Sequence, residues 1–279
     1  MHLSGSMRTG NGEGGGDEQK EKKKNKIWKG EWSNGMKYNL VLDPGATSVA
    51  VVLLVRAGSR NEPKEKWHGV AHFVEHMLFK SSISGTEKEM LRPLYEYGGK
   101  INAYTSEELT VYHINLAPAG VWTALDTLCE MFRGAQFDPT EINTERGVVI
   151  SEAARVSSEA ERWLFLDAFP SFVFCGEKGL DHNPIGKPSG LAVMDPDMLV
   201  AFFEVFYQPL NLCLSVCGSW DEKDGDLLDY VTAKFGQWKG AARSYNVVDP
   251  VRFAAYVSQL QLSSTPIKKK QQEKKKKRM

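Results

Sequence analysis

Long apolar runs are missing from this sequence of 279 residues. The longest, about residues 49–55, is far shorter than the ~20 apolar residues of a membrane-spanning helix, so we expect no transmembrane segment. The N-terminus also lacks an apolar signal region, and we predict a cytoplasmic chain, with a mitochondrial location as the alternative. Cysteines are few and show no disulfide-framework spacing, so we predict buried, reduced thiols at Cys129, Cys175, Cys213 and Cys217.

A net charge is missing too, because 35 Lys and Arg residues balance 35 Asp and Glu residues. The balance hides an asymmetry. Residues 268–279 carry eight basic residues and one acidic residue, and residues 1–26 carry six basic and four acidic ones, which leaves a net charge of −9 on residues 27–267. An acidic body argues against a nucleic-acid-binding function. It is compatible with cations, either metal ions or basic peptide segments.

Composition divides the chain into three parts. Residues 1–26 are rich in Gly, Lys and Glu and have almost nothing to bury, so we predict that they are disordered. Residues 27–240 hold the regular hydrophobic patterns and are predicted to form one domain. Residues 241–279 are predicted to contain the truncated start of a second domain, followed by a Lys-rich tail.

Strand-like runs come in adjacent pairs in the central part, with helix-like segments after each pair. Strands are predicted at 36–42, 48–56, 100–105, 109–116 and 211–218. Helices are predicted at 69–78, from Thr86 to Gly98, and at 119–133, 139–156, 160–173, 195–206 and 222–236. Paired strands that do not alternate singly with helices indicate an α+β fold, in which helices pack on an antiparallel sheet.

The most informative segment is His72-Phe73-Val74-Glu75-His76. Two histidines four residues apart lie on one face of a helix, so their imidazoles can reach a single ion. Glu75 lies next to that face and can take a proton from water without binding the metal. Zinc accepts such ligands and lowers the pKa of a bound water to about 7. The alternative interpretation is a helix with two surface histidines.

A third ligand has to come from another segment. The helix predicted from residue 139 offers Glu145 and Glu152, seven residues apart, on one face with Val148, Val149 and Val156. Two carboxylates on an apolar face cost free energy unless they are paired or bind a metal. We therefore expect one of them to bind the ion and the other to support the site. The alternative is that they pair with Arg146 or Arg155.

Five motifs in this order give the sequence a resemblance to the pitrilysin (M16) metallopeptidase family, which includes insulin-degrading enzymes and mitochondrial processing peptidases. Besides H-x-x-E-H, the matching stretches are GKINAYTS at 99–106, ER-x-VV-x-x-E at 145–152, H-x-P-x-G at 182–186 and Y-x-P-x-N at 207–211. The resemblance covers about residues 35–236. It implies the N-terminal catalytic domain of such a peptidase.

The resemblance implies a role for each matching residue. His72, His76 and Glu152 would bind one Zn²⁺ per chain, Glu75 would be the general base, and Glu145 would be a supporting catalytic carboxylate.

The resemblance also implies that the strand at 101–105 is an edge strand on which a peptide docks as an added strand. Asn102, Ala103 and Tyr104 would then contact the substrate, although Asn102 has the alternative role of satisfying a turn. Glu107 stands where many family members have Arg. His68 and His113 are predicted not to bind the metal. The aromatic residues at 202, 203, 206 and 207 are predicted to pack in the core.

The function implied is that of a zinc metalloendopeptidase that hydrolyses peptides or unfolded polypeptides. Family members place a second, similar domain after the first, and this second half supplies an Arg and a Tyr that help to bind the substrate. Residues 240–267 are too few for such a domain, so we expect a second M16-type half or subunit as partner. The alternative function is a non-catalytic, peptide-binding or partner-dependent subunit.

Overall fold

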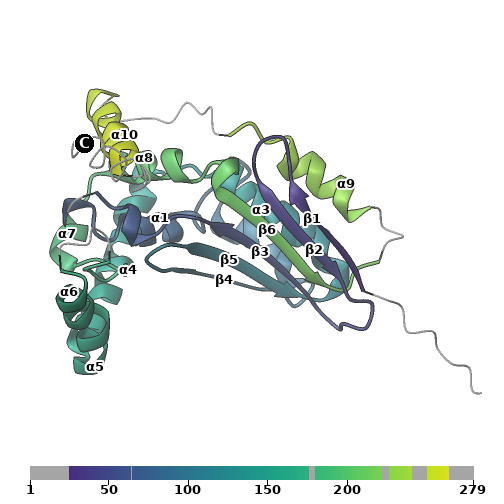
Figure 1. The fold of residues 1–279 in the computed structure, drawn as a ribbon, viewed down its shortest axis with the longest axis horizontal. Helices are drawn as coiled ribbons and strands as arrows, with labels where there is room; N and C mark the ends of the chain where they lie inside the picture. The colour runs from purple at the N-terminus through teal and green to yellow at the C-terminus, as the bar shows by residue number, and fades with distance from the viewer. Residues whose placement is uncertain (1–24, 64, 176–179, 222–225, 241–249, 264–279) are drawn as a thin grey trace, which may run out of the picture.

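The computed structural model describes residues 25–63, 65–175, 180–221, 226–240 and 250–263. In this part of the chain, helices cover one face of a six-stranded sheet and gather at one of its ends (Figure 1). The predicted α+β class is thus confirmed. The disorder predicted for residues 1–26 is wrong at Lys26, which begins a strand. Residues 1–24 and the Lys-rich tail at 268–279 lie outside the described ranges.

The strands follow the order β1-β2-β6-β3-β5-β4 across the sheet. Their bounds are β1 (Lys26–Glu31), β2 (Lys37–Leu42), β3 (Val49–Val55), β4 (Lys100–Thr105), β5 (Thr110–Leu116) and β6 (Leu212–Gly218). All neighbouring pairs are antiparallel except β2 and β6, which are parallel, so the predicted antiparallel sheet is confirmed at every pair but this one. Strand β1 was not predicted, because it is exposed along most of its length and lacks an apolar alternation.

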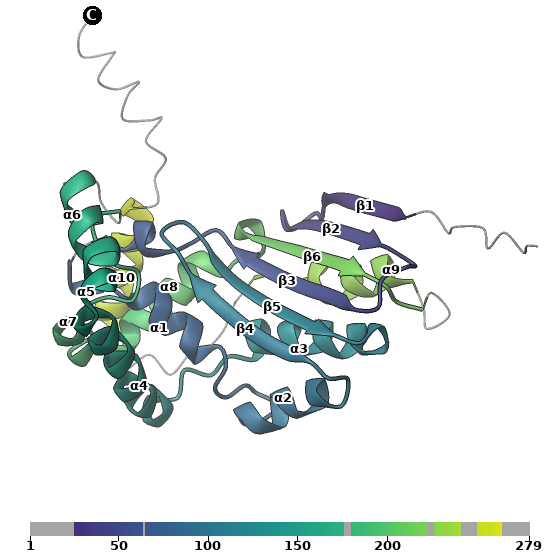
Figure 2. The same cartoon turned by 90° about the horizontal axis from the view of Figure 1, so that it is seen from below.

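The parallel pair arises because β6 inserts between β2 and β3, two strands that are close neighbours in sequence (Figure 2). The end of β6 shows why glycine is required there. Gly218 has a φ of +139°, and a Cβ at this position would lie 2.3 Å from the carbonyl oxygen of Ser48. Its own carbonyl accepts a hydrogen bond from the N–H of Asp43 at 2.7 Å. The insertion thus needs a residue without a side chain.

Helices form where they were predicted, with differences at their ends. Their bounds are α1 (Val70–Met77), α2 (Glu87–Tyr95), α3 (Val121–Gly134), α4 (Pro139–Ser158), α5 (Ala160–Trp163), α6 (Phe169–Val173), α7 (Pro188–Ala192), α8 (Pro196–Phe206), α9 (Leu227–Val231) and α10 (Pro250–Ser263). The carboxylate of Asp138 accepts hydrogen bonds from the N–H groups of Thr140 and Glu141 and so caps α4. Helix α2 ends at Tyr95, three residues before Gly98.

Two predicted helices are broken by π-helical turns. Residues 164–168 form such a turn between α5 and α6, and residues 232–236 form another after α9. The first four residues of the helix predicted at 222–236 lie outside the described ranges. Helix α7 was not predicted, because five residues are too short to show a helical period.

The core lies between the sheet and its helices. Along β3 the side chains alternate, with Val49, Val51, Leu53 and Val55 buried and the residues between them half-buried on the open face. The aromatic residues predicted for the core are buried as expected: Phe202, Phe203, Phe206 and Tyr207. Helix α10 packs on α8, and its Tyr256 and Leu260 join this core. The domain boundary at residue 240 stays a prediction.

The cysteine prediction is only partly right. Cys129 is buried and Cys213 is half-buried, but Cys175 and Cys217 are exposed. Side chains alternate between the core and the open face along β6, and Cys217 lies on the open face. An apolar run in the sequence does not show on which face a given residue lies. None of the described helices is long and apolar enough to cross a membrane.

An exposed apolar segment follows the end of α4. Eight large side chains there are 39–85% exposed: Trp163, Leu164, Phe165, Leu166, Phe169, Phe172, Val173 and Phe174. Exposed apolar side chains this numerous in one short segment are unusual on a protein surface.

We expect the substitution Phe203→Ala to destabilise the fold by ~3–5 kcal/mol, because a fully buried aromatic ring is replaced by a cavity. The ring of Phe203 lies 4.9 Å from that of Tyr207 and 5.1 Å from that of Phe137. Urea denaturation measures the loss. Phe172→Ala is the matched control, since Phe172 is 85% exposed, and its effect should stay within about 0.5 kcal/mol. Equal losses in the two variants would contradict this description of the core.

Candidate metal centre

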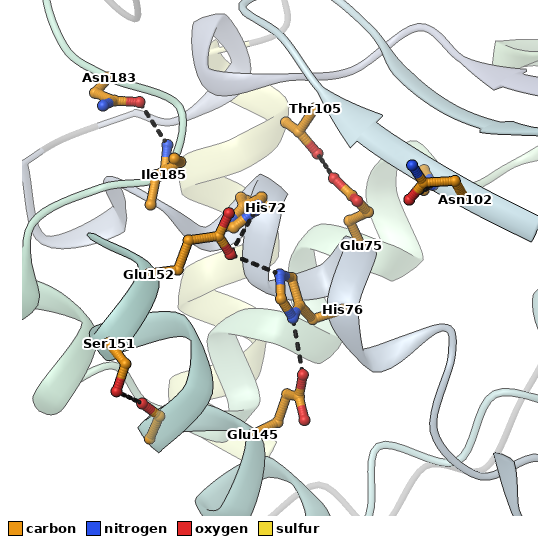
Figure 3. A network of polar contacts seen from close by, with 12 residues as sticks. His72, Glu75, His76, Asn102, Thr105, Glu145, Ser151, Glu152, Asn183 and Ile185 are labelled. Carbon is orange, nitrogen blue, oxygen red and sulfur yellow. Dashed lines mark hydrogen bonds and ion pairs between the residues drawn. The ribbon is translucent and has the colours of Figure 1, made fainter. Parts of the chain in front are cut away.

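Helix α1 presents three polar side chains from an otherwise apolar segment. Its apolar residues face the core, and His72, Glu75 and His76 point into a cleft between β4 and α4 (Figure 3). His72 and Glu75 are nevertheless buried, with exposed fractions of 8% and 6%. The spacing of four residues places the two imidazoles one helical turn apart, with ring centroids separated by 4.6 Å and ring planes at 72° to each other.

Glu152 of α4 lies opposite the two histidines. Its Oε2 atom is 3.4 Å from Nε2 of His76 and 3.8 Å from Nε2 of His72. One donor atom from each of the three residues lies within 4.8 Å of the other two. Two imidazole nitrogens and one carboxylate oxygen form a donor set that suits zinc, with room for a fourth ligand. The three predicted ligands are thus brought together.

The orientation of His72 fits a metal site. Its Nε2 faces Glu152, whereas its Nδ1 is buried and has no hydrogen-bond partner among the described residues. Burial, helped by the positive charge of His76, lowers the pKa of His72 to about 4. The imidazole is therefore neutral at physiological pH, which is the form that binds metal ions.

The second nitrogen of His76 is held by Glu145. The Nδ1–H group donates to Oε1 of Glu145 at 2.8 Å, and Lys80 Nζ donates to Oε2 of Glu145 at 2.9 Å. Lys80 also contacts Glu87 at 3.1 Å. A carboxylate behind a histidine fixes the tautomer and leaves Nε2 free to face the cleft. Glu145 thus occupies the supporting position that was expected of it.

Charges around His76 stabilise its protonated form in the metal-free chain. Burial alone would lower the pKa of His76, but hydrogen bonds to Glu145 and Glu152 raise it to about 9. The hydrogen bond to His76 lowers the pKa of Glu152. The proton on His76 therefore neutralises part of a site that contains several carboxylates.

Glu75 sits beside the donor set and does not belong to it. Its Oε2 atom accepts a hydrogen bond from the hydroxyl of Thr105, at the end of β4, at 2.5 Å. Burial raises the pKa of Glu75 to about 7 in the metal-free chain. A carboxyl group with a pKa near the working pH can both take up and release a proton.

Strand β4 forms one wall of the cleft, which has a volume of about 530 Å³. Asn102, Ala103 and Tyr104 line it, and Ile185 lies on the other side near His72 (Figure 3). Because β4 is the last strand of the sheet, its outer edge is unpaired within the sheet. There the N–H of Ala103 donates to the side chain of Asn102 at 2.9 Å.

A larger hollow of about 720 Å³ lies elsewhere, beside α3 and near α2. Its charged residues are engaged with neighbours, as in the ion pair of Asp126 with Lys234 at 2.8 Å. Of the described residues, the only group of three or more His, Cys, Asp or Glu side chains placed to hold a metal ion is the one in the β4 cleft.

Comparison with known proteins agrees with this geometry. Residues 39–173 match the family described as Insulinase (Peptidase family M16). This chain carries an M16 peptidase domain. The M16 domain is similar to the uncharacterized zinc protease YmxG of Bacillus subtilis, with 28% identity over 217 residues, which are 78% of this chain and 52% of YmxG.

Two further similarities fit the M16 assignment. A probable mitochondrial-processing peptidase subunit beta of Arabidopsis thaliana is 31% identical over 154 residues, which are 55% of this chain and 28% of that protein. The crystal structure of the first half of the periplasmic protease PqqL from Escherichia coli has a TM-score of 0.66 and 27% identity, covering 79% of this chain and 49% of that one. The chain thus spans about half the length, or less, of these relatives.

The predictions for three further residues can be compared with the structure, and two of the three agree with it. His68 is outside the donor set and stacks on His182. His113 is half-buried on β5, opposite Asn102. Val148 is 51% exposed, so it does not share the buried face of α4 with Glu145 as predicted. Successive residues of a helix point about 100° apart, and Val148 lies too far round from that face.

Sequence reasoning gave no role in the site to several residues that line the cleft, among them Thr105, Lys80 and Ile185. Thr105 belonged to the recognised NAYTS stretch, but its hydroxyl was given no role. Lys80 follows α1 in a turn, and its spacing from the histidines carries no signal. Ile185 lies inside the H-x-P-x-G stretch, whose place beside the cleft depends on tertiary structure.

We expect His76 of the metal-free chain to titrate near pH 9. Glu145→Gln removes a negative charge and should lower this pKa by about one unit or more. Nuclear magnetic resonance of the histidine ring resonances measures it. His182 serves as the internal control, since its partners are Glu62 and Asp181. A His76 pKa that does not change in Glu145→Gln would show that Glu145 does not hold the proton.

Proposed function

We propose that this chain supplies the zinc-binding half of a metalloendopeptidase site that acts on peptides or unfolded polypeptides. The observation that supports this most is the convergence of His72, His76 and Glu152 on one point, with Glu75 beside them. The names of relatives such as the zinc protease YmxG support the same reaction class.

In this proposal His72, His76 and Glu152 hold one zinc ion through Nε2, Nε2 and Oε2. When bound, zinc acidifies a water molecule to a pKa of about 7 and polarises a carbonyl oxygen. The chain's own contribution is to hold both imidazoles in position, with His72 kept neutral by burial. The Nδ1–H hydrogen bond to Glu145 orients the ring of His76 and also favours its protonated form, so an ion held at Nε2 would have to displace a proton from that nitrogen.

Glu75 moves the proton of the reaction. Thr105 occupies Oε2 of Glu75, so Oε1 is the atom that faces a water molecule and removes its proton. The same oxygen then delivers this proton to the nitrogen of the departing amine as the peptide bond breaks. Burial favours the first step, because it makes the ionised carboxylate less stable and therefore a stronger proton acceptor.

The peptide lies along β4 as an added strand. Its backbone accepts a hydrogen bond from the N–H of Ala103, which replaces the hydrogen bond to the side chain of Asn102. The amide of Asn102 is then free to contact the peptide. The exposed ring of Tyr104 supports the side chains of the peptide next to it. Because the contacts are made mainly by backbone atoms, the enzyme tolerates many sequences.

A second M16-type half or subunit is the proposed partner. The matched part of this chain covers 52% of YmxG and 28% of the Arabidopsis subunit, and the exposed apolar segment 163–174 directly follows α4, which carries Glu152. A partner over this segment would cover the apolar surface and exclude water from the cleft, which strengthens charge stabilisation there. The second candidate function is a non-catalytic peptide-binding subunit, which is favoured by the edge of β4 that is unpaired within the sheet, since a peptide can bind there without any reaction.

We expect Glu75→Gln to keep its zinc and to lose peptide hydrolysis by about 10²–10⁴-fold, because the proton acceptor is removed while the ligands stay. Elemental analysis measures the zinc, and a quenched fluorescent peptide measures the rate. Glu130→Gln, in the hollow beside α3, is the control for an equivalent change outside the cleft. Zinc in the wild type without any hydrolysis would favour the non-catalytic function, and no zinc at all would contradict the metalloendopeptidase function.

Strand addition predicts an alternating dependence on the substrate backbone. Every second residue of an added strand points its N–H toward the partner strand, and the residues between point away. N-methylation of one amide at a time along a cleaved peptide should therefore raise KM at every second position. A KM that is insensitive to methylation at all positions would exclude docking on β4.

A further inference from the structure

A second cluster of titratable side chains lies at the start of α1. Glu62 has a fully buried side chain, and both of its oxygens are used. Oε1 accepts a hydrogen bond from the N–H of Ala71 at 3.0 Å, and Oε2 accepts one from the N–H of Gly69 at 3.1 Å. Oε2 also lies 2.8 Å from Nε2 of His182. The proposed reaction uses none of these groups directly.

Glu62 performs the task of a helix cap from outside the helix. Gly69 stands at the N-cap position with a φ of +94° and has no side chain to satisfy the first amides of α1. The carboxylate of Glu62 satisfies two of them and places a negative charge at the positive end of the helix. A remote residue thus replaces the usual local Ser, Thr or Asp.

The cap matters because α1 is short. It has eight residues, and His72 is the third of them. Terminal turns of helices fray, and a helix of this length has few internal hydrogen bonds to resist it. Any loosening of the first turn would therefore move His72 away from His76, which sits one turn further on.

His182 connects this cap to the opposite wall of the cleft. Its Nδ1 lies 3.2 Å from Oδ1 of Asp181, so the ring stands between two carboxylates. Against burial, which would lower it, the contact with Glu62 raises the pKa of His182. The ring also stacks on that of His68, with centroids 3.4 Å apart and planes 6° from parallel. The loop from Asp181 to Gly186 is thereby attached to the start of α1.

Backbone contact completes the attachment. A Cβ on Gly69 would lie 2.6 Å from the carbonyl oxygen of Ile185, and a Cβ on Gly186 would lie 2.6 Å from that of His68. Gly186 has a φ of +79°, so both glycines are required at this contact. Ile185 itself lines the cleft together with His72 and Glu152. The loop and the first turn of α1 therefore form one unit.

We propose that Glu62 and His182 are positioning residues that hold the first turn of α1 and the loop 181–186 together, and so keep His72 and Ile185 in place at the cleft. The proposal rests on the proposed function, since it assigns His72 to the ion. Neither residue touches the ion or the peptide. Their contribution is to the affinity for metal, through the geometry of His72.

The test measures zinc affinity by competition with a chromophoric chelator in the wild type, Glu62→Gln, His182→Asn and the double variant. Glu62→Gln keeps the shape of the side chain, but it turns an amide N–H group toward N–H groups that donate hydrogen bonds to the carboxylate in the wild type. We expect it to weaken zinc binding about tenfold, within the range for residues that support metal ligands. The zinc affinity of the double variant should be no lower than that of the single variant that binds zinc less tightly, because the two residues act as one unit.

Leu128→Ala is the control for general destabilisation. Leu128 is fully buried in α3, so its truncation lowers the thermal unfolding midpoint, but we expect zinc affinity to stay within twofold of the wild type. Wild-type affinity in Glu62→Gln would overturn the proposal. An equal loss of affinity in Leu128→Ala would overturn it as well, because the effect would then follow stability alone.

Hydrogen exchange of the metal-free chain separates this proposal from the proposed function. Amides at the start of α1, such as that of Phe73, which donates to Gly69, should exchange at least tenfold faster in Glu62→Gln than in the wild type. If the wild type binds no zinc but these amides exchange faster in the variant, the positioning role stands and the metallopeptidase function fails. Unchanged exchange would overturn the positioning role whatever the zinc result.

Discussion

The contact between α1 and α4 is the constraint on which the site depends, because it brings the carboxylate of Glu152 to two imidazoles. The two helices are separated by more than sixty residues of sequence, and neither carries a complete donor set. Apolar packing supplies the driving force for the contact, since α1 is buried along nearly its whole length. Once the two helices pack together, the positions of the histidines on α1 and of Glu152 on α4 place their side chains opposite one another.

Charge balance explains why so many acidic groups can meet in one place. Three glutamates, at 75, 145 and 152, surround two histidines, and Lys80 adds a permanent positive charge. In the metal-free chain the proton on His76 and the raised pKa of Glu75 relieve the repulsion. Such a site is electrostatically prepared for a divalent cation, because the cation can replace protons that the site already binds.

The parts of the site that follow from helical periodicity could be predicted from the sequence. His72 with His76, and Glu145 with Glu152, share helix faces by spacing alone, and the family resemblance then distinguished the two carboxylates. Lys80, Thr105 and Glu62 could not be assigned, because their partners lie on other segments and no local pattern encodes these contacts. The same reason applies to the sheet. The insertion of β6 beside β2 is a long-range pairing, and β1 lacks the apolar alternation that reveals a strand.

The donor atoms come from positions 72, 76 and 152, so they are close to one another only after the chain has folded. An unfolded chain keeps at most the local pair of histidines. Any ion held by all three residues therefore binds the native state far better than the unfolded one. By mass action it adds RT ln(1 + [ion]/Kd) to the free energy of unfolding, about 2.7 kcal/mol when the free ion is a hundred times Kd. The metal supply of the cell would then influence how long this protein survives, in addition to any effect on catalysis.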